Sequence, residues 1–330
     1  MSLFQRCAVV GAGSWGTALA LAAARAGREV VLWGRDGAQM QAMALSRRNA
    51  RYLPDAMLPA AIRPSADPAD LAGVDFTLMV TPAQSLRAVA GALAGALAPG
   101  APIVLCAKGI ERGSGRLMSE VAAQALPGRP VAALSGPSFA QDVGRGLPTA
   151  VTLAAEDGGL AERLGAALGS SSFRLYHTTD LVGVELGGAA KNVLAIACGV
   201  AQGRGLGASA NAALIARGFA ELSRFARAHG ARAETLMGLS GLGDLVLTCN
   251  STQSRNYSLG IALGRGEALA EADHGKLAEG AATAPVLVAM ARAKGVETPI
   301  AEAVAALLAG KIDVTSVIDG LMGRPQKAEV

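Results

Sequence analysis

Lys191 stands in a segment whose other residues are almost all small or apolar, ELGGAAKNVLAIACGVAQG. If this segment is a helix, the neighbours of Lys191 at i±3 and i±4 are glycine, leucine and alanine, and none of them can solvate an ammonium group. A desolvated lysine has a lowered pKa and can act as an acid or base near neutral pH. Most helical lysines are solvated surface residues, but the small apolar face here predicts a catalytic acid/base with space for a ligand beside it.

A glycine-rich turn lies near the start of the chain, in CAVVGAGSWGTALALAAARAG. It follows a predicted strand and opens a predicted helix. Gly11 allows a tight turn, Gly13 lets the backbone approach a pyrophosphate, and Gly16 lets the helix pack closely on the sheet. Glycine-rich turns without a ligand are common, but the strand, helix and second strand stand here in the order of a dinucleotide site.

The end of the second predicted strand bears on which dinucleotide is bound. NAD enzymes usually carry an acidic residue at this point, which accepts hydrogen bonds from the ribose hydroxyls. This chain has Arg35 followed by Asp36. We favour NADP, because a guanidinium group matches the geometry of a 2′-phosphate. NAD stays the alternative, since Asp36 can serve the ribose.

Polar residues also follow two later predicted strands, where an α/β sheet presents its ligand. Lys108 comes directly after one of these strands, and Gly136 and Ser138 come after the next. Ordinary loop and turn chemistry accounts for such residues equally well.

A second polar group occurs in GLSGLGDLVLTCNSTQSRNYSLG. It contains Asp244 and, further on, Ser254, Arg255 and Asn256 before a helical pattern. Serine and asparagine are common helix caps. With an arginine at a helix N-terminus, however, they form a credible phosphate site.

These residues must be positioned by an α/β fold. Short apolar runs alternate with helical patterns in the first half of the chain, which predicts a doubly wound, Rossmann-type parallel sheet with helices on both faces. Beyond about residue 180 the pattern is helical, with glycine-rich loops at 203–207 and 238–243. We therefore expect a dinucleotide-binding domain at residues 1–180 and a mostly α-helical substrate-binding domain at residues 181–330. The predicted strands are 7–10, 29–33, 76–80, 103–107, 130–134, 150–154 and 173–176.

Length and hydropathy are those of a cytoplasmic protein. A chain of 330 residues can form two cores, since single cores stop growing near ~250–300 residues. The longest apolar stretch, 186–201, is shorter than the ~18–20 residues of a membrane-spanning helix and contains Lys191 and Asn192. We expect no stable membrane insertion.

Charge and cysteine content narrow the choice of ligand. The formal net charge is only +4, and aromatic residues make up 3% of the chain. The arginines are scattered, so a small phosphorylated substrate explains them better than a nucleic acid, which would require a clustered basic face. The four cysteines lie far apart and show no metal-ligand spacing, so we expect neither a metal site nor a disulfide framework.

Together these segments resemble the bacterial-type NAD(P)-dependent glycerol-3-phosphate dehydrogenases. The resemblance runs in order from residue 6 to about residue 285 and therefore covers nearly the whole chain. Its segments are GAGSWGTALA, WGRD, CAKGIE, LSGPSFA, ELGGAAKNVLAIACGVAQGRGLGASANAALIARGFAE, GLSGLGDLVLTC and SRNYSLG. The long segment around Lys191 and the SRN segment are specific, whereas the glycine turn occurs in many related dehydrogenases.

The resemblance implies a homodimer that reversibly reduces dihydroxyacetone phosphate to sn-glycerol 3-phosphate for glycerophospholipid synthesis. Lys191 would be the acid/base, and Lys108 would help to lower its pKa. The residues implied at the cofactor, with the glycine turn, are Gly11, Gly13, Ser14, Trp15, Gly16, Arg35, Lys108, Ala140, Arg255, Leu277 and Glu279. Those implied at the substrate are Lys108, Gly136, Ser138, Lys191, Asp244, Ser254, Arg255 and Asn256. The chain departs from the family pattern at Leu277, usually valine, and at Ala278, usually a bulkier aliphatic residue.

Two other functions compete with this one. A related two-domain dehydrogenase for a β-hydroxy acid would share the fold, but a carboxylate substrate requires no separate phosphate site such as the SRN segment. A dinucleotide-sensing regulatory protein would keep the glycine turn, but it would have no use for a desolvated lysine.

Overall fold

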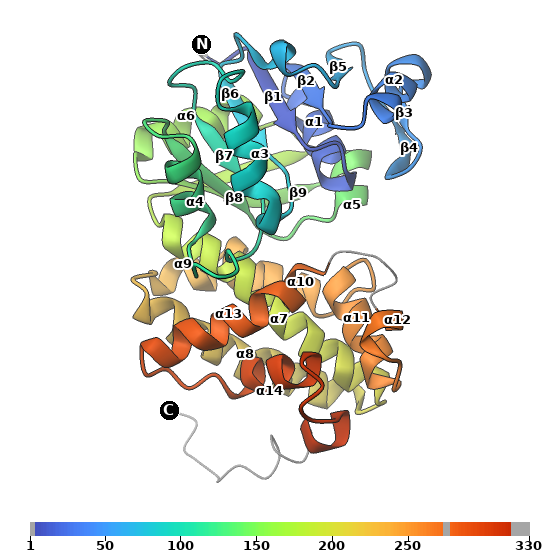
Figure 1. Ribbon diagram of the computed structural model, residues 1–330, viewed down its shortest axis with the longest axis vertical. Helices are drawn as coiled ribbons and strands as arrows, with labels where there is room; N and C mark the ends of the chain where they lie inside the picture. The colour runs from blue at the N-terminus through green and yellow to red at the C-terminus, as the bar shows by residue number, and fades with distance from the viewer. Residues whose placement is uncertain (1–3, 273–277, 318–330) are drawn as a thin grey trace.

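The computed structural model describes residues 4–272 and 278–317, which form a sheet with helices on its faces followed by a group of helices (Figure 1). Within these residues, eight strands make one sheet in the order β10-β9-β8-β7-β6-β1-β2-β5, and β3 and β4 form a separate pair. The strands are β1 (Arg6–Val10), β2 (Glu29–Trp33), β3 (Arg48–Asn49), β4 (Leu53–Met57), β5 (Ile62–Ser65), β6 (Phe76–Met79), β7 (Ile103–Leu105), β8 (Val131–Ser135), β9 (Thr149–Ala155) and β10 (Phe173–Thr178).

Helices cover both faces of the sheet. On one face α1 and α6 pack on Val9, Leu32 and Leu153, and on the other α3 and α4 pack on Val10, Met79 and Leu105. Neighbouring residues of a strand point to opposite faces, so strands that are buried on both sides appear in the sequence as continuous apolar runs. The helices of this half are α1 (Ser14–Arg25), α2 (Gly37–Ser46), α3 (Leu86–Leu93), α4 (Met118–Ala125), α5 (Ala140–Arg145) and α6 (Gly158–Leu168), with single 3-10 turns at Pro68–Leu71 and Ala83–Ser85.

The predicted fold class is confirmed, with two differences in the sheet. All seven predicted strands are present, but the edge strand β5 was not predicted. It is four residues long and contains Pro64, which is tolerated at a sheet edge and weakens the strand signal. In addition, β8 and β9 are antiparallel. A parallel connection usually returns along the sheet through an α-helix, whereas residues 136–148 between these strands contain only the six-residue α5, which is too short to run the length of β9.

The second half of the chain is helical and surrounds α7 (Figure 1). By length and composition α7 could cross a membrane, but 94% of its most apolar window is buried inside the protein, so it is the core helix of this half. It extends beyond the apolar stretch seen in the sequence at both ends. The helices are α7 (Leu181–Gly203), α8 (Gly207–Ala228), α9 (Ala233–Met237), α10 (Asp244–Thr248), α11 (Arg255–Gly264), α12 (Leu269–Ala272), α13 (Glu279–Ala293) and α14 (Pro299–Leu308).

The glycine-rich segments of this half are less irregular than predicted. Gly203 is the last residue of α7 and Gly207 the first of α8, so only a short turn separates these helices. The expectation of a loop at 238–243 was wrong, because Leu239–Gly243 forms a π-helical turn that leads directly into α10. A Cβ atom on Gly241 would lie 1.9 Å from the Leu236 carbonyl oxygen, so only glycine fits this turn.

Two pairs of glycines bring α7 and α11 together. A Cβ atom on Gly199 would lie 2.2 Å from the Tyr257 carbonyl oxygen, and one on Gly203 would lie 2.3 Å from that of Ile261. On α11, Gly260 and Gly264 face the backbone of α7 equally closely. The two helices therefore cross backbone against backbone, and Arg255 and Asn256 at the start of α11 lie close to the middle of α7.

Candidate active site

Lys191 lies in the middle of α7 with its ammonium group among polar partners. It is 5% exposed. Its Nζ donates a hydrogen bond to Oδ1 of Asp244 and another, 2.8 Å long, to Oγ1 of Thr248. Asp244 and Thr248 are the first and last residues of α10 and lie one turn apart on the same face. The π-helical turn before α10 thus places this face against Lys191.

Lys108 brings a second ammonium group to the same carboxylate. It follows β7, and its Nζ lies 2.6 Å from Oδ2 of Asp244 and 3.1 Å from the Gly136 carbonyl oxygen. Each oxygen of Asp244 therefore accepts from a different lysine. Gly136 follows β8, the neighbour of β7 in the sheet, and its φ of +146° favours glycine. The carboxyl ends of two adjacent strands thus meet the helical half of the molecule at Asp244.

The pKa values reflect this arrangement. Burial lowers the pKa of Lys191 to about 8; Asp244 opposes this shift, and the charge of Lys108 adds to it. Burial alone would raise the pKa of Asp244, but the two lysines together hold it below its ordinary value. The cluster therefore contains a carboxylate and an amine that can hold or release a proton near neutral pH.

Two asparagine side chains form a chain of hydrogen bonds beside this cluster. Asn192 donates from Nδ2 to the Lys108 carbonyl oxygen at 3.0 Å. Asn256 donates from Nδ2 to Oδ1 of Asn192 at 3.0 Å, and its own Oδ1 accepts from the backbone N–H of Gly280 at 2.9 Å. The chain connects the loop after β7 with α7, α11 and the start of α13.

The glycine turn after β1 has the geometry required around a pyrophosphate. Gly11 has a φ of +119°, and a Cβ atom on Gly16 would lie 1.7 Å from the Gly11 carbonyl oxygen. A Cβ atom on Gly13 would meet nothing within 4 Å, so open space lies in front of this residue. Gly13 is also the N-cap of α1 and provides no side-chain hydrogen bond to it. The first N–H groups of α1 therefore remain available for an anion, and these residues fit a dinucleotide.

Further candidate cofactor residues lie around the turn. Arg35 is exposed, whereas Oδ1 of Asp36 caps α2 by accepting from the Gln39 N–H. Glu279 accepts from the Ala83 N–H through Oε1, while its buried Oε2 has no partner among the described residues. Burial raises the pKa of Glu279, and nearby Arg255 partly offsets this shift. An unpaired oxygen buried between the two halves of the molecule is a point at which a ligand group can bind.

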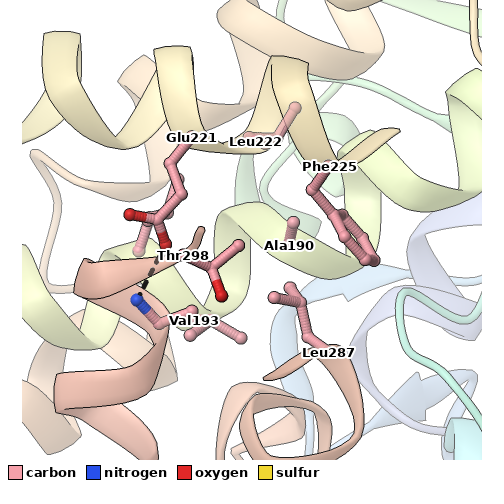
Figure 2. Close-up of a pocket in the computed structure, with 9 residues that line it drawn as sticks. Ala190, Val193, Glu221, Leu222, Phe225, Leu287 and Thr298 are labelled. Atoms are coloured by element: carbon pink, nitrogen blue, oxygen red, sulfur yellow. Dashed lines mark hydrogen bonds between the residues drawn. The ribbon is translucent and has the colours of Figure 1, made fainter. Parts of the chain in front are cut away.

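A separate cavity lies in the helical core (Figure 2). It has a volume of about 10 Å³, roughly the space of one water molecule. It is lined by Ala190, Val193, Leu194, Glu221, Leu222, Phe225, Leu287, Thr298 and Ala301. None of the residues predicted for cofactor or substrate lines it, so it is not part of the candidate active site.

Comparison with known proteins identifies the family. Two models that describe the N-terminal and C-terminal parts of NAD-dependent glycerol-3-phosphate dehydrogenase match residues 6–161 and 180–319. The chain belongs to the NAD-dependent glycerol-3-phosphate dehydrogenase family. It is 60% identical over 329 residues to an Azorhizobium caulinodans protein named glycerol-3-phosphate dehydrogenase, NAD(P)+, and covers 100% of both chains. It is 62% identical to the protein of that name from Methylobacterium radiotolerans, over 97% of each chain.

The family is also evident in the fold. The crystal structure of glycerol-3-phosphate dehydrogenase from Coxiella burnetii matches with a TM-score of 0.92 at 40% identity, over 97% of this chain and 99% of that one. The predicted family and fold class are thus confirmed, and the chain is an NAD(P)-dependent oxidoreductase of this family.

The structure brings most of the predicted substrate residues together. Lys108, Gly136, Lys191 and Asp244 are connected by direct hydrogen bonds. Asn256 joins them through Asn192. Ser138 donates to the Gly136 carbonyl oxygen, and Ser254 caps α11 by accepting from the Tyr257 N–H.

The remaining predicted residues of this dehydrogenase are spread more widely. Ser14 donates to the Tyr52 carbonyl oxygen, and Trp15 has a buried indole N–H with no partner among the described residues. Ala140 is the first residue of α5, and Arg255 is the exposed first residue of α11. Leu277 lies outside the residues that the structure describes.

Two members of the polar cluster, Asn192 and Thr248, were not among the predicted site residues. The sequence predicts the surroundings of Lys191 only from its own helix face, on which no group solvates the ammonium. That expectation was incomplete, because Asp244 and Thr248 come from another helix. Thr248 was detectable in principle, since it stands at i+4 from Asp244 and so shares its face on a helix.

Proposed function

We propose that this protein reduces dihydroxyacetone phosphate reversibly to sn-glycerol 3-phosphate with NADPH or NADH. The observation that carries the proposal is the buried cluster in which Asp244 accepts from both Lys191 and Lys108. A buried ionic group of this kind is costly to maintain, and perturbed pKa values concentrate at functional sites. Glycerol-3-phosphate dehydrogenase is also the name printed for relatives of about 60% identity.

Lys191 serves as the general acid and base. When bound, the reduced nicotinamide supplies the hydride that reaches the carbonyl carbon of the substrate. Lys191 gives its proton to the oxygen that becomes the hydroxyl group, and takes it back in the reverse direction. Lys108 stabilises negative charge on that oxygen, while Asp244 holds both amines in position.

The N-terminus of α11 holds the substrate phosphate. Arg255 provides a guanidinium group at the first position of the helix, and Ser254 caps it. The amide of Asn256 is engaged with Asn192 and Gly280, so its contribution is to fix the helix end relative to the acid/base. Binding energy from the remote phosphate then orients the carbonyl carbon for transfer.

The cofactor lies along the glycine turn, and NADPH is preferred over NADH. Asp36 is partly committed to capping α2, whereas Arg35 is exposed at the end of β2. Replacing Arg35→Ser removes a charged contact to the 2′-phosphate, so kcat/KM for NADPH falls by about 10- to 100-fold. The value for NADH changes little. Equal losses with both cofactors would exclude this role for Arg35.

Broader features of the protein belong to the same proposal. Residues 1–180 bind the dinucleotide, and residues 181–330 complete the substrate site. The protein acts in the cytoplasm as a homodimer, for which light scattering after size exclusion is the direct test. Its product enters glycerophospholipid synthesis.

The deciding experiment follows NADPH, and separately NADH, by absorbance with dihydroxyacetone phosphate as substrate. Rapid oxidation by the wild type and near-complete loss in Lys191→Ala are the expected results. If neither cofactor is oxidised, the proposed reaction is wrong, and β-hydroxy acids become the substrates to screen.

A further inference from the structure

Glu185 is a buried carboxyl group close to the active site that the proposed chemistry does not use. It lies in the second turn of α7, and its side chain reaches the start of α4 on the other half of the molecule. Oε1 accepts from the Ser119 backbone N–H at 2.8 Å, and Oε2 accepts from the Ser119 hydroxyl at 2.6 Å. Burial raises the pKa of Glu185 to about 7, and the Ser119 hydrogen bonds oppose this shift.

The start of α4 depends on this outside partner. The N-cap of α4 is Leu117, whose side chain cannot accept a hydrogen bond from the first N–H groups of the helix. Its own backbone N–H is bonded to Glu120 at 2.8 Å. Glu185 therefore supplies the cap that the local sequence lacks, and supplies it from the helix that carries Lys191.

The start of α4 is directly connected to the segment that carries Lys108. Residues 106–117 connect β7 to α4, and Ile110 pairs with Leu117 across an antiparallel bridge. Movement at the start of α4 is thus passed to Ile110, two residues from Lys108. At its other end, the segment is held by the hydrogen bond from Asn192 to the Lys108 carbonyl oxygen.

Glu185 and Asn192 stand seven residues apart on α7, two helical turns along one face. Between them lies Gly188, where a Cβ atom would come within 3.5 Å of Cγ of Lys108. This face of α7 therefore holds the Lys108 segment at both of its ends and leaves room for the lysine between them. The hydrogen bonds of Gln84 to Ile110 and of Arg87 to Glu111 hold the same segment from the sheet side.

We propose that Glu185 is a positioning residue that sets the place of Lys108 against Asp244 and Lys191 by anchoring the start of α4 to α7. The inference rests on the proposed role of Lys108 in the reaction. It assigns to Glu185 no contact with substrate or cofactor.

A double-mutant cycle tests the proposal on the full-length protein with NADPH and dihydroxyacetone phosphate. Glu185→Ala lowers kcat/KM by about tenfold, because small displacements of a catalytic group are costly. In a Lys108→Ala background the same substitution costs about twofold or less, since its effect passes through Lys108. Equal fold losses in the two backgrounds would overturn the proposal, whereas an inactive wild type would instead refute the proposed reaction.

The dependence of kcat/KM on pH is a second test. Its midpoint would not change if Glu185 only stabilised the fold. Burial and the charge of Lys108 lower the pKa of Lys191, while Asp244 raises it. The nearby thiol of Cys249 has a pKa well above its ordinary value and is therefore uncharged in this pH range. Displacing Lys108 therefore raises the pH at which reduction declines. Glu185→Ala and Lys108→Ala are expected to shift this midpoint upward together. An unchanged midpoint in Glu185→Ala would contradict the proposal.

Two further variants separate positioning from folding. Glu185→Gln keeps an acceptor for the Ser119 N–H, so its kcat/KM stays within about threefold of the wild type. Glu221, labelled in Figure 2, is the matched control. It is also buried and caps a helix start, accepting from the Ile300 and Ala301 N–H groups at 2.9 Å. Glu221→Ala lowers the thermal unfolding temperature without moving the pH midpoint. If Glu185→Ala does not fold, Ser119→Ala replaces it in the same cycle with a smaller expected loss.

Discussion

Both halves of α7 contain glycines that are closely packed, but the glycines of the two halves face different parts of the molecule. In the first half, Gly187 faces the backbone of the π-helical turn, and Gly188 faces the side chains of Lys108 and of Ser135, the last residue of β8. In the second half, Gly199 and Gly203 face the backbone of α11. The buried charged and amide side chains of this helix, Glu185, Lys191 and Asn192, lie in the first half, whereas the amide of the second half, Gln202, is exposed. The first half of α7 therefore leaves room for side chains of the candidate active site, and the second half leaves room for the backbone of α11.

The comparison shows why one helix belongs to both core and site. The glycine crossing leaves α7 and α11 almost no freedom to slide, because their backbones are in contact. Arg255 and Asn256 at the start of α11 are thereby held at a set distance from Lys191. The position of Lys191 relative to α11 is well defined, because the first half of α7 continues into the second half, whose backbone is packed against α11.

The largest expected effect comes from removing the acid/base. Lys191→Met keeps the length of the side chain but removes the proton donor, so kcat falls by about 10²- to 10⁴-fold in either direction. Asp244 keeps Lys108 as a partner, and the protein stays folded. Steady-state rates and thermal unfolding measure the two properties. Lys294→Met, at an exposed lysine after α13, is the control and changes neither. Retained activity in Lys191→Met would show that the first half of α7 does not carry the acid/base.

The next largest effect concerns the other half of α7. In Gly199→Ala the new methyl group meets the Tyr257 carbonyl oxygen, which cannot move without separating the helices. We expect a loss of about 1–3 kcal/mol in the free energy of unfolding, measured with denaturant. Gly91→Ala in α3 is the matched control, since a Cβ atom there meets nothing within 4 Å. It raises stability by about 0.5–1 kcal/mol. A neutral Gly199→Ala would mean that the helices cross less tightly than described.

A glycine substitution in the first half should have the reverse profile. The methyl group of Gly188→Ala would meet Oγ of Ser135 at 2.8 Å and Cγ of Lys108 at 3.5 Å, both on side chains that can turn away. Only the Ser135 hydroxyl has to move, so stability changes little, but the methyl group fills the space beside Lys108 and removes its freedom to adjust, which lowers kcat/KM by about tenfold. Parallel measurements on Gly188→Ala and Gly199→Ala test the contrast directly. It fails if both variants lose stability and activity in the same proportion.

Local patterns made much of this structure predictable from the sequence. Strands buried on both faces appear as apolar runs, and the turn at Gly11, Gly13 and Gly16 is marked by the spacing of its own glycines. Lys191 was detectable because its own helix face is so apolar. The edge strand β5 was missed because it is short and contains a proline.

Contacts between distant segments were not predictable in the same way. Lys108 and Asp244 are 136 residues apart in the chain, and only the fold shows that one carboxylate accepts from two lysines. Asn192 and Asn256 likewise resemble ordinary helix residues until α7 and α11 are packed together. Glu185 gave no sign of its role, because its partner Ser119 lies 66 residues away in the chain and only the fold brings the two together.

The smallest expected effect is the change of kcat/KM with pH in the wild type. It tests directly whether burial in the first half of α7 lowers the pKa of Lys191. Lys191 must be protonated to act as the acid in reduction, so kcat/KM in that direction is constant well below pH 8 and declines as the pH rises through the pKa of about 8. In oxidation it must be neutral, and kcat/KM rises through the same pH. Both profiles report the free enzyme. A common midpoint near 10.5, the ordinary value for lysine, would mean that burial does not act on Lys191. The first half of α7 would then differ from the second in its residues, but it would not contain a lysine with a lowered pKa.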